Sequence, residues 1–517
     1  MSITVSPATT AAVEQTAFGD DAIDVVESWV ASTDHRRLGR LHLGATLLLG
    51  TVGAVLFAFA AQRVDAAVRG DLGTGRWLGG STDAGFSFAR VLSFAQQGLI
   101  VVVMAPMFLA LASIVVPGQI GASRLAFPRL HAFVVWSYIV GAALFVTSYL
   151  VVDGPPSVDL LGSVSGLTSG KPVNKATDLL VASLAVVAFS TLLGAINIFT
   201  TVLTHRRAGL SLEQVRPFTW AAFVTAAVSI LTIPVHLSGL LLLYIDQHFG
   251  GTFALTDGSE VLWSHMLRFT TRPEMYLVLI PALGLVGEIV VTRTGRSLLG
   301  GHVASYLVAA AAALSLFAWL GGTTSGDSFI QPTNRWFTSL IVIPVGMLVL
   351  VWLGSLAGGL RPDTSLLGAL GVPLLLVLAA VNVLIAAARS LDAATQGAVW
   401  TIGQVVLLAV AIPVVAGVAG ISELSPLALG RSLARPIAGL ATLTALGGGV
   451  LTVVGFAALA NRNDQSSSAP ALSALMMLGG LLLAGALGIT LLGLLSASRT
   501  TGSTNAAHLL PFSEETN

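Results

Sequence analysis

Apolar residues fill long runs along almost the whole chain, and short polar segments separate these runs. A run of about 20 apolar residues is long enough to cross the hydrocarbon core of a membrane as a helix. Twelve such runs are present, at approximately residues 41–61, 91–116, 132–152, 178–204, 217–245, 261–292, 302–320, 337–359, 365–388, 397–420, 434–460 and 469–496. The pattern predicts an all-α polytopic membrane protein with twelve transmembrane helices.

The polar segments divide the chain into a membrane domain and two tails. Residues 1–34 lack the basic start and the clean apolar core of a signal peptide, so we expect an N-terminal tail. Residues 35–497 form the predicted membrane domain. Residues 498–517 form a polar C-terminal tail of the kind that is often poorly ordered.

Basic residues favour one orientation in the membrane. Every second connecting segment is rich in arginine, whereas the other connecting segments carry mixed charge. The arginines concerned are Arg36, Arg37, Arg40, Arg124, Arg129, Arg206, Arg207, Arg216, Arg293, Arg296, Arg431 and Arg435. Because basic loops stay on the cytoplasmic side, both termini are predicted to be cytoplasmic.

Composition narrows the classes of function. The chain is 55% hydrophobic and 10% charged, with a mean hydropathy of +0.87, whereas a soluble protein would carry far more surface charge. The net charge of zero argues against a nucleic-acid partner. The absence of cysteine excludes disulfides, thiolate metal sites and a cysteine nucleophile.

A set of short motifs occurs in a fixed order along the chain. In order they are STDHRRLG (32–39), IGASRLAFPRL (120–130), GAINIFTT (194–201), DQHFGGTF (246–253), RPEMY (272–276), RWFTS (335–339) and SLD (390–392). Each motif is weak alone, but their order and spacing together resemble subunit I of the haem–copper oxidases. The resemblance covers nearly the entire membrane portion and implies the twelve-helix bundle of that subunit.

The resemblance also implies six histidine ligands for two haems and a copper ion, because imidazole suits both metals. None of the matching positions is a histidine here. They hold Gln97, Arg272, Gly321, Gly322, Gln404 and Val406. Among the nine histidines, His236 alone is expected deep in the membrane, so no other set can replace the ligands. The prediction is therefore that the chain has no catalytic residues, no metal site, no haem and no copper.

The proton paths that the resemblance implies are also altered. An aspartate position holds Arg124, two asparagine positions hold Ser113 and His131, and the lysine position in the eighth run holds Leu348. Glu274 and Tyr276 do match the family, within the RPEMY motif. The tyrosine cannot form its family cross-link to a copper histidine, because Arg272 stands in that histidine's place.

The polar residues inside the apolar runs have alternative interpretations. Arg272 is either a paired structural cation or an anion- or quinone-binding group, and the structural interpretation is favoured. Gln97 and Gln404 are expected to satisfy each other or nearby backbone rather than to bind metal. His236 is expected to be a satisfied bundle histidine. Glu288 is expected to pair with an arginine of the loop after its run, with proton relay as the alternative.

Small residues predict close helix packing near the C-terminus. Glycines cluster at Gly447–Gly449 and at Gly479–Gly480, in the last two apolar runs. Glycine allows helix backbones to approach closely in membranes. This signal is generic, and it permits either close helix approach within the chain or dimerisation.

Three functions remain open. The preferred one is a haem-free, copper-free membrane scaffold subunit of a respiratory-type complex in a prokaryotic plasma membrane, with other membrane subunits and the lipid bilayer as partners. The second is a subunit that binds a quinone, a lipid or a small solute in the vacated haem cavity. Its expected lining is Arg272, Glu274, Tyr276, His236 and Gln404. The third is a cytochrome-c or quinol oxidase with unusual cofactor ligation.

Overall fold

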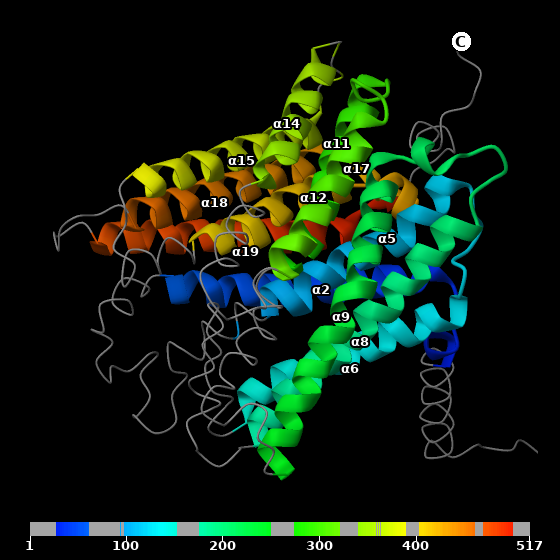
Figure 1. Ribbon diagram of the computed structural model, residues 1–517, viewed down its shortest axis with the longest axis vertical. Coiled ribbons are helices and arrows are strands. Elements are labelled where there is room, and N and C mark those ends of the chain that lie inside the picture. Colours follow the sequence, from blue (N-terminus) through cyan, green and yellow to red (C-terminus); the bar gives the residue numbers. More distant parts are fainter. Residues whose placement is uncertain are drawn as a thin grey trace, which may run out of the picture.

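The computed structural model describes residues 27–61, 94, 98–151, 175–249, 273–320, 340–357, 359, 361, 363–388, 403–460 and 469–499. The described residues are almost entirely helical, and they form an elongated bundle (Figure 1). The long helices are α2 (His35–Ala61), α5 (Ala105–Ile120), α6 (Pro128–Leu150), α8 (Lys175–Thr204), α9 (Pro217–Phe249), α11 (Pro273–Thr294), α12 (Val303–Leu320), α14 (Val342–Leu356), α15 (Thr364–Ala388), α17 (Ile412–Leu429), α18 (Arg435–Ala460) and α19 (Ala469–Ser496).

Shorter elements complete the described chain. Two π-helical segments, η1 (Gly98–Met104) and η3 (Leu407–Ala411), run directly into α5 and α17. The 3-10 turn η2 (Leu212–Gln214) precedes α9. The strands β1 (Arg431–Ser432) and β2 (Ser498–Arg499) pair in antiparallel fashion, so the first residues of the expected C-terminal tail contact the segment before α18.

Ten helices of the described chain are long and apolar enough to cross a membrane. Two shorter apolar helices, Val303–Phe317 and Val342–Leu356, stand where the seventh and eighth spans are expected. The all-helical membrane fold is confirmed, whereas the count of exactly twelve spans stays a prediction. The sixth expected span, 261–292, is described only from Pro273, and α11 then continues to Thr294.

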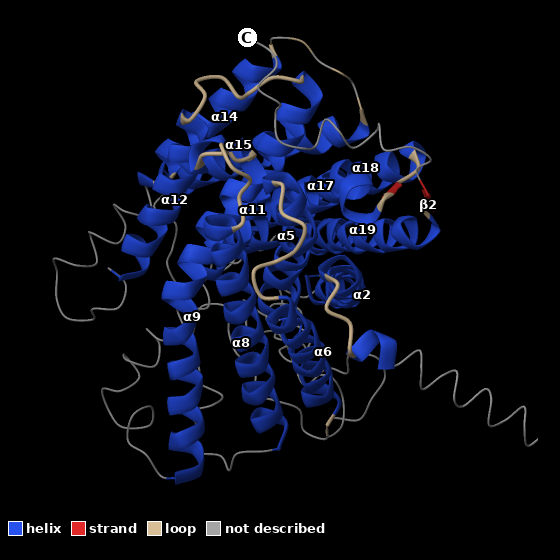
Figure 2. Ribbon diagram, turned by 90° about the vertical axis from the view of Figure 1, so that its right-hand side faces the viewer, coloured by secondary structure: helices blue, strands red, loops and turns tan. Residues whose placement is uncertain are grey.

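The helices differ in how deeply they are buried. In the apolar windows, 89% of the residues are buried for α11, against 33% for α6. Helix α11 contacts α9, α12, α15 and α17, so it lies at the centre of the bundle. Helices α6, α8 and α9 lie side by side at one flank, as Figures 1 and 2 show.

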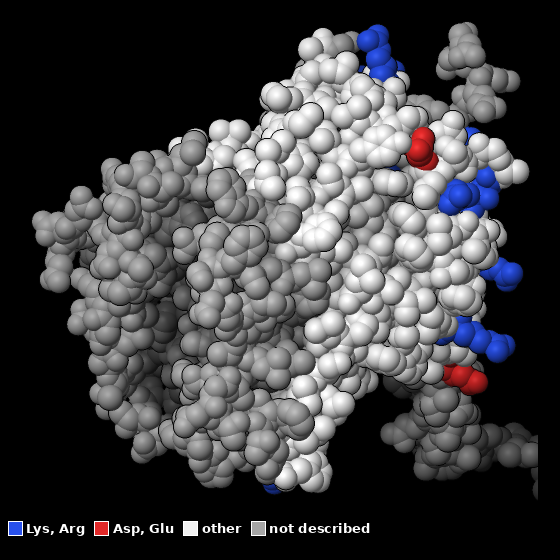
Figure 3. Space-filling view, in the orientation of Figure 1, with Lys and Arg blue, Asp and Glu red and all other residues white. Residues whose placement is uncertain are grey.

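Basic side chains of the described residues gather along one edge. In Figure 3 most of the basic side chains that are drawn lie along this edge, and the white surface beside it carries no charged side chain. Exposed arginines of the described chain include Arg124 and Arg207 on loops and Arg129 at the start of α6. The alternation of basic and mixed loops and the direction of the bundle across the membrane stay predictions.

Helices α18 and α19 pack through the glycines singled out in the sequence. A Cβ atom built on Gly448 would lie 2.7 Å from the carbonyl oxygen of Gly479 and 2.8 Å from the backbone nitrogen of Leu483. A Cβ on Gly479 would lie 2.6 Å from the backbone nitrogen of Thr452. These contacts are with backbone, which cannot move aside, so the two helices approach closely through these glycines.

Alanine at Gly448 or Gly479 is expected to destabilise the protein by about 1–3 kcal/mol, because the added methyl group forces the helices apart. Thermal unfolding of the detergent-purified protein, followed by tryptophan fluorescence, measures the change. Gly485→Ala is the matched control on α19, since a Cβ there meets nothing within 4 Å. Equal destabilisation by all three substitutions would contradict the packing argument.

Candidate functional site

Two π turns, η1 before α5 and η3 before α17, lie next to positions that the family resemblance assigns to haem ligands. Segment η1 begins directly after Gln97, and η3 begins directly after Val406. The two segments contact each other inside the bundle. A π turn widens the helix locally, changes the direction of nearby side chains and is frequent at functional sites. The apolar pattern of the sequence gave no signal for either turn.

The described ligand positions on the tenth span do not fit a haem. Val406 is 3% exposed, belongs to the main apolar core and has no lone pair to offer a metal. Gln404 is 9% exposed, and its Nε2 has no hydrogen-bond partner among the described residues. The two histidine ligands that the family resemblance implies at positions 404 and 406 are therefore replaced by side chains that do not suit haem iron.

Several predicted positions cannot be compared with side-chain geometry. Gln97, Arg272, Gly321 and Gly322 lie outside the described residues. The roles expected for these positions, including the bond between Gln97 and Gln404, stay predictions.

Three further members of the expected cavity lining lie on described helices. Glu274 and Tyr276 belong to the first turn of α11, where only the backbone is described. His236 is buried on α9, two residues after Pro234. Its burial agrees with a bundle histidine, and a shared cavity for these residues stays a prediction.

The retained GAINIFTT motif has a structural role. Asn197 on α8 accepts a hydrogen bond from the backbone nitrogen of Phe127 at 3.1 Å and donates one to the carbonyl oxygen of Phe127 at 2.9 Å. The hydroxyl of Thr201 accepts from the backbone nitrogen of Ala126 at 2.9 Å. The motif therefore fixes the turn that starts α6, which explains how two distant parts of the resemblance are linked.

The altered proton-path positions are occupied by groups with other roles. The hydroxyl of Ser113 donates to the carbonyl oxygen of Ala110 in its own helix at 2.7 Å. Arg124 is exposed, and His131 is buried near the start of α6. Leu348 is 2% exposed in the apolar core and has no transferable proton.

Glu288 is the centre of a buried polar network that joins three helices. Its Oε1 accepts from Nε of Arg216 at 2.5 Å and from Nε2 of Gln119 at 2.9 Å. The hydroxyl of Thr219 donates to Oε1 of Gln119 at 2.6 Å. The network ties α5, α9 and α11 together. The prediction that Glu288 pairs with an arginine is confirmed, but the expected loop was wrong. The partner is Arg216, which directly precedes Pro217 at the buried start of α9, and not an arginine of the loop after α11.

A second network was missed in the sequence. Arg293, at the end of α11, pairs with Oδ2 of Asp363 at 2.7 Å and also with Glu423. The hydroxyl of Ser365 donates to Oε2 of Glu423 at 2.6 Å. Glu423 is buried on α17, inside an apolar run. A carboxylate in such a run needs a partner, so its position was the signal that could have revealed this network.

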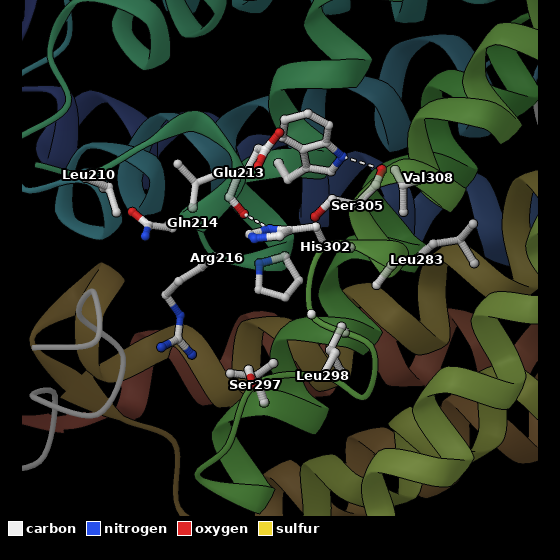
Figure 4. Close-up of a pocket in the computed structure, with 18 of the residues that line it drawn as sticks. Leu210, Glu213, Gln214, Arg216, Leu283, Ser297, Leu298, His302, Ser305 and Val308 are labelled. Carbon is white, nitrogen blue, oxygen red and sulfur yellow. Dashed lines mark hydrogen bonds between the residues drawn. The ribbon is translucent and has the colours of Figure 1, made fainter. Parts of the chain in front are cut away.

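A cavity of about 680 Å³ opens between α9, α11, α12 and α14 (Figure 4). The segment from Arg207 to Pro217 and the segment from Ser297 to His302 contribute to its lining. At its polar side, Nδ1 of His302 lies 3.1 Å from the carbonyl oxygen of Glu213. His236 and Gln404, the two members of the expected haem-cavity lining whose side chains the structure describes, do not line this cavity.

The fold and these positions define a polytopic helical membrane protein with the architecture of the oxidase bundle. The family model described as Cytochrome C and Quinol oxidase polypeptide I matches residues 37–462. The chain belongs to this family. It is accordingly a multi-pass protein of the prokaryotic plasma membrane, in line with its apolar helices and its bacterial relatives.

The relatives are bacterial oxidase subunits. The chain is 28% identical over 380 residues to a probable cytochrome c oxidase subunit 1-alpha of Streptomyces coelicolor, covering 71% of this chain and 62% of the relative. It is 29% identical over 303 residues to a probable subunit 1-beta of Nocardia farcinica, covering 58% and 52%. It is 30% identical over 301 residues to cytochrome c oxidase subunit 1 of Cereibacter sphaeroides, covering 56% and 53%.

The comparison with solved structures shows the fold alone. A haem–copper terminal oxidase dimer studied by cryo-electron microscopy has a TM-score of 0.64 at 14% sequence identity, covering 90% of this chain and 85% of that chain. The matches to the relatives named above span between about half and three fifths of their length. The activity and the partners of this chain are therefore matters for proposal.

Glu288→Gln is expected to lower the free energy of unfolding by about 3–5 kcal/mol, because it leaves the buried Arg216 without its counter-charge. Arg216→Met combined with Glu288→Gln is expected to cost less than the sum of the two single substitutions. Thermal unfolding of the four proteins gives the coupling energy. Arg129→Gln, at an exposed arginine, serves as the control within about 0.5 kcal/mol of the parent protein. Additive losses would show that the pair is not coupled.

Proposed function

We propose that this chain is a non-catalytic, haem-free and copper-free relative of cytochrome c oxidase subunit I. It acts as a membrane scaffold subunit of a respiratory-type complex. The observation that carries the proposal is Val406, a buried apolar side chain at a position where the family resemblance places a haem ligand. The π turn η3 follows Val406 immediately, and the valine side chain offers no donor atom to a metal.

Replacement of one ligand alone would leave room for a substitute, but the altered positions are spread over the whole site. Gln97, Arg272, Gly321, Gly322 and Gln404 stand at the other five positions that resemble ligand sites. Glutamine and glycine side chains are poor or absent ligands for haem iron, and arginine stays protonated in proteins. The six altered positions support a protein that keeps the helical bundle of the family and lacks its redox chemistry.

The contacts that are present support a packing role. Asn197 fixes the turn before α6, and the pair of Arg216 with Glu288 fixes the ends of α9 and α11. Neither contact needs a cofactor to form. A bundle held in this way offers a rigid surface to other membrane subunits, with both termini on the cytoplasmic side.

A second candidate function is favoured by one observation. The Nε2 group of Gln404 is a buried donor without an acceptor among the described residues. A quinone, a lipid or a small solute in the vacated haem cavity would supply that acceptor. Arg272, Glu274, Tyr276 and His236 would be the other members of its site.

Purification from the native membrane separates these functions. The scaffold function predicts no haem absorption in the visible spectrum, copper below one tenth of an equivalent and co-purifying membrane subunits. The Cereibacter sphaeroides relative, purified in the same way, is the positive control for haem. Stoichiometric haem would overturn the scaffold function and would point to the third possibility, an oxidase with unusual ligation. A retained small molecule that is lost in Gln404→Leu would favour the second candidate.

A further inference from the structure

The cavity of about 680 Å³ has an apolar wall on its helix side and polar groups on its loop side (Figure 4). Leu283, Val291 and Val308 make part of the apolar wall, on α11 and α12. The loop side carries the exposed residues Gln214 and His302. A cavity of this volume, largely apolar with a few polar groups, is typical of sites that bind a small organic molecule.

The charged side chains that line this cavity already interact within the protein. Arg216 donates to Oε1 of Glu288 at 2.5 Å, and both side chains are buried. The hydroxyl of Tyr306 donates to Oε1 of Glu213 at 2.9 Å. Arg207 also has an interaction within the protein. A charged molecule would have to compete with one of these contacts, so the arrangement favours an uncharged one.

His302 offers a hydrogen-bond acceptor to a ligand. Its Nδ1 lies 3.1 Å from the carbonyl oxygen of Glu213. Because a carbonyl oxygen only accepts, Nδ1 carries the proton, and Nε2 of the uncharged ring is then an acceptor. Nε2 of His302 makes no hydrogen bond with the described part of the chain. A hydroxyl or N–H group of a ligand is the partner that this nitrogen can bind.

Further neutral polar groups surround the same space. Oε1 of Gln214 accepts from the backbone nitrogen of Ser211 at 3.1 Å, so the amide NH₂ group is the part of Gln214 that a ligand oxygen can use. Ser297 and Ser305 also line the cavity. In Figure 4, Gln214, His302 and Ser305 lie on one side of the cavity, and Ser297 lies on the other.

Trp220 adds an aromatic ring of fixed orientation to the wall. Its Nε1 donates to the carbonyl oxygen of Ser305 at 2.8 Å, so its N–H group is already used within the protein. The half-buried indole ring lines the cavity. Aromatic rings pack favourably against one another in stacked or edge-to-face arrangements, so an aromatic ligand suits this wall.

We propose that this cavity binds a small uncharged aromatic molecule that carries a hydroxyl group. The hydroxyl donates to Nε2 of His302, and the ring packs against Trp220 and the apolar wall. Phenols in the aqueous phase and quinols in the membrane share this chemistry. The site is separate from the candidate haem-volume site, since neither Gln404 nor His236 lines the cavity.

Binding of two matched probes tests the proposal. The full chain is placed in nanodiscs of phosphatidylethanolamine and phosphatidylglycerol, and probe fluorescence is titrated with empty nanodiscs as the blank. The probes are beta-naphthol and beta-methylnaphthalene, which have the same ring system and differ in the hydroxyl group. The parent protein is expected to bind beta-naphthol saturably and about fivefold more tightly than beta-methylnaphthalene, as one hydrogen bond predicts.

Two histidine variants separate the hydrogen bond from general effects. His302→Asn keeps an amide group near the place of Nδ1 and removes Nε2, so the preference for the hydroxyl probe is expected to disappear. His205→Asn changes a histidine that does not line the cavity and is expected to keep the preference. Val308→Trp fills the apolar wall and is expected to weaken the binding of both probes. Thermal unfolding of each variant shows whether the protein is still folded.

Competition distinguishes the two sources of such a ligand. Displacement of beta-naphthol by p-cresol alone supports a ligand from the aqueous phase, and displacement by menaquinol in the nanodisc supports one from the membrane. Displacement by neither would overturn the proposal. Equal binding of both probes by the parent protein would contradict the hydrogen bond to His302, and uptake equal to that of empty nanodiscs would contradict a site in the cavity.

Discussion

The buried ion pair between Arg216 and Glu288 is the interaction on which the arrangement of the central helices depends. Both side chains are almost wholly buried, so neither charge can be satisfied by water. Desolvation of two charges costs several kcal/mol for each ion, and only close geometry with further hydrogen bonds offsets that cost. Gln119 and Thr219 supply these bonds, and they do so only when α5, α9 and α11 are in their observed positions. The pair therefore specifies where these helix ends lie, beyond any stability it adds.

The need to satisfy every polar group inside a membrane bundle explains which features of the fold could be predicted from the sequence. Helical runs are visible because a membrane span must satisfy its backbone internally and present apolar side chains along about 20 residues. The glycines of α18 and α19 were a generic signal of close approach, since only a residue without a side chain fits a backbone contact, but they did not identify which helices meet. A charged residue inside an apolar run signals that a partner exists. It does not identify the partner, because several arginines are near Glu288 in sequence and the one that pairs with it, Arg216, is 72 residues away.

Features that depend on the packing of several distant elements could not be predicted from the sequence. The two π turns depend on how η1 and η3 pack against each other, and the apolar pattern is the same for an α turn and a π turn. The cavity needs four helices and two loops to be placed at once, so no local motif marks it. Glu423 is different, because its position in an apolar run was visible and its interaction with Arg293 and Ser365 follows from the same rule that applied to Glu288.

The relation between backbone shape and chemistry is clearest at the tenth span. The family resemblance assigns a haem ligand to the position of Val406, and the valine contributes apolar contacts to the core there, where a histidine would offer a donor atom. The π turn beside it packs against η1. A protein interior tolerates no large void, so under the proposed haem-free state the volume that a haem occupies must be taken up by side chains, by lipid or by another bound molecule. Under the scaffold function side chains fill the haem volume, whereas under the small-molecule function a bound molecule fills it. The Nε2 group of Gln404, which has no acceptor among the described residues, is the donor that such a molecule would satisfy.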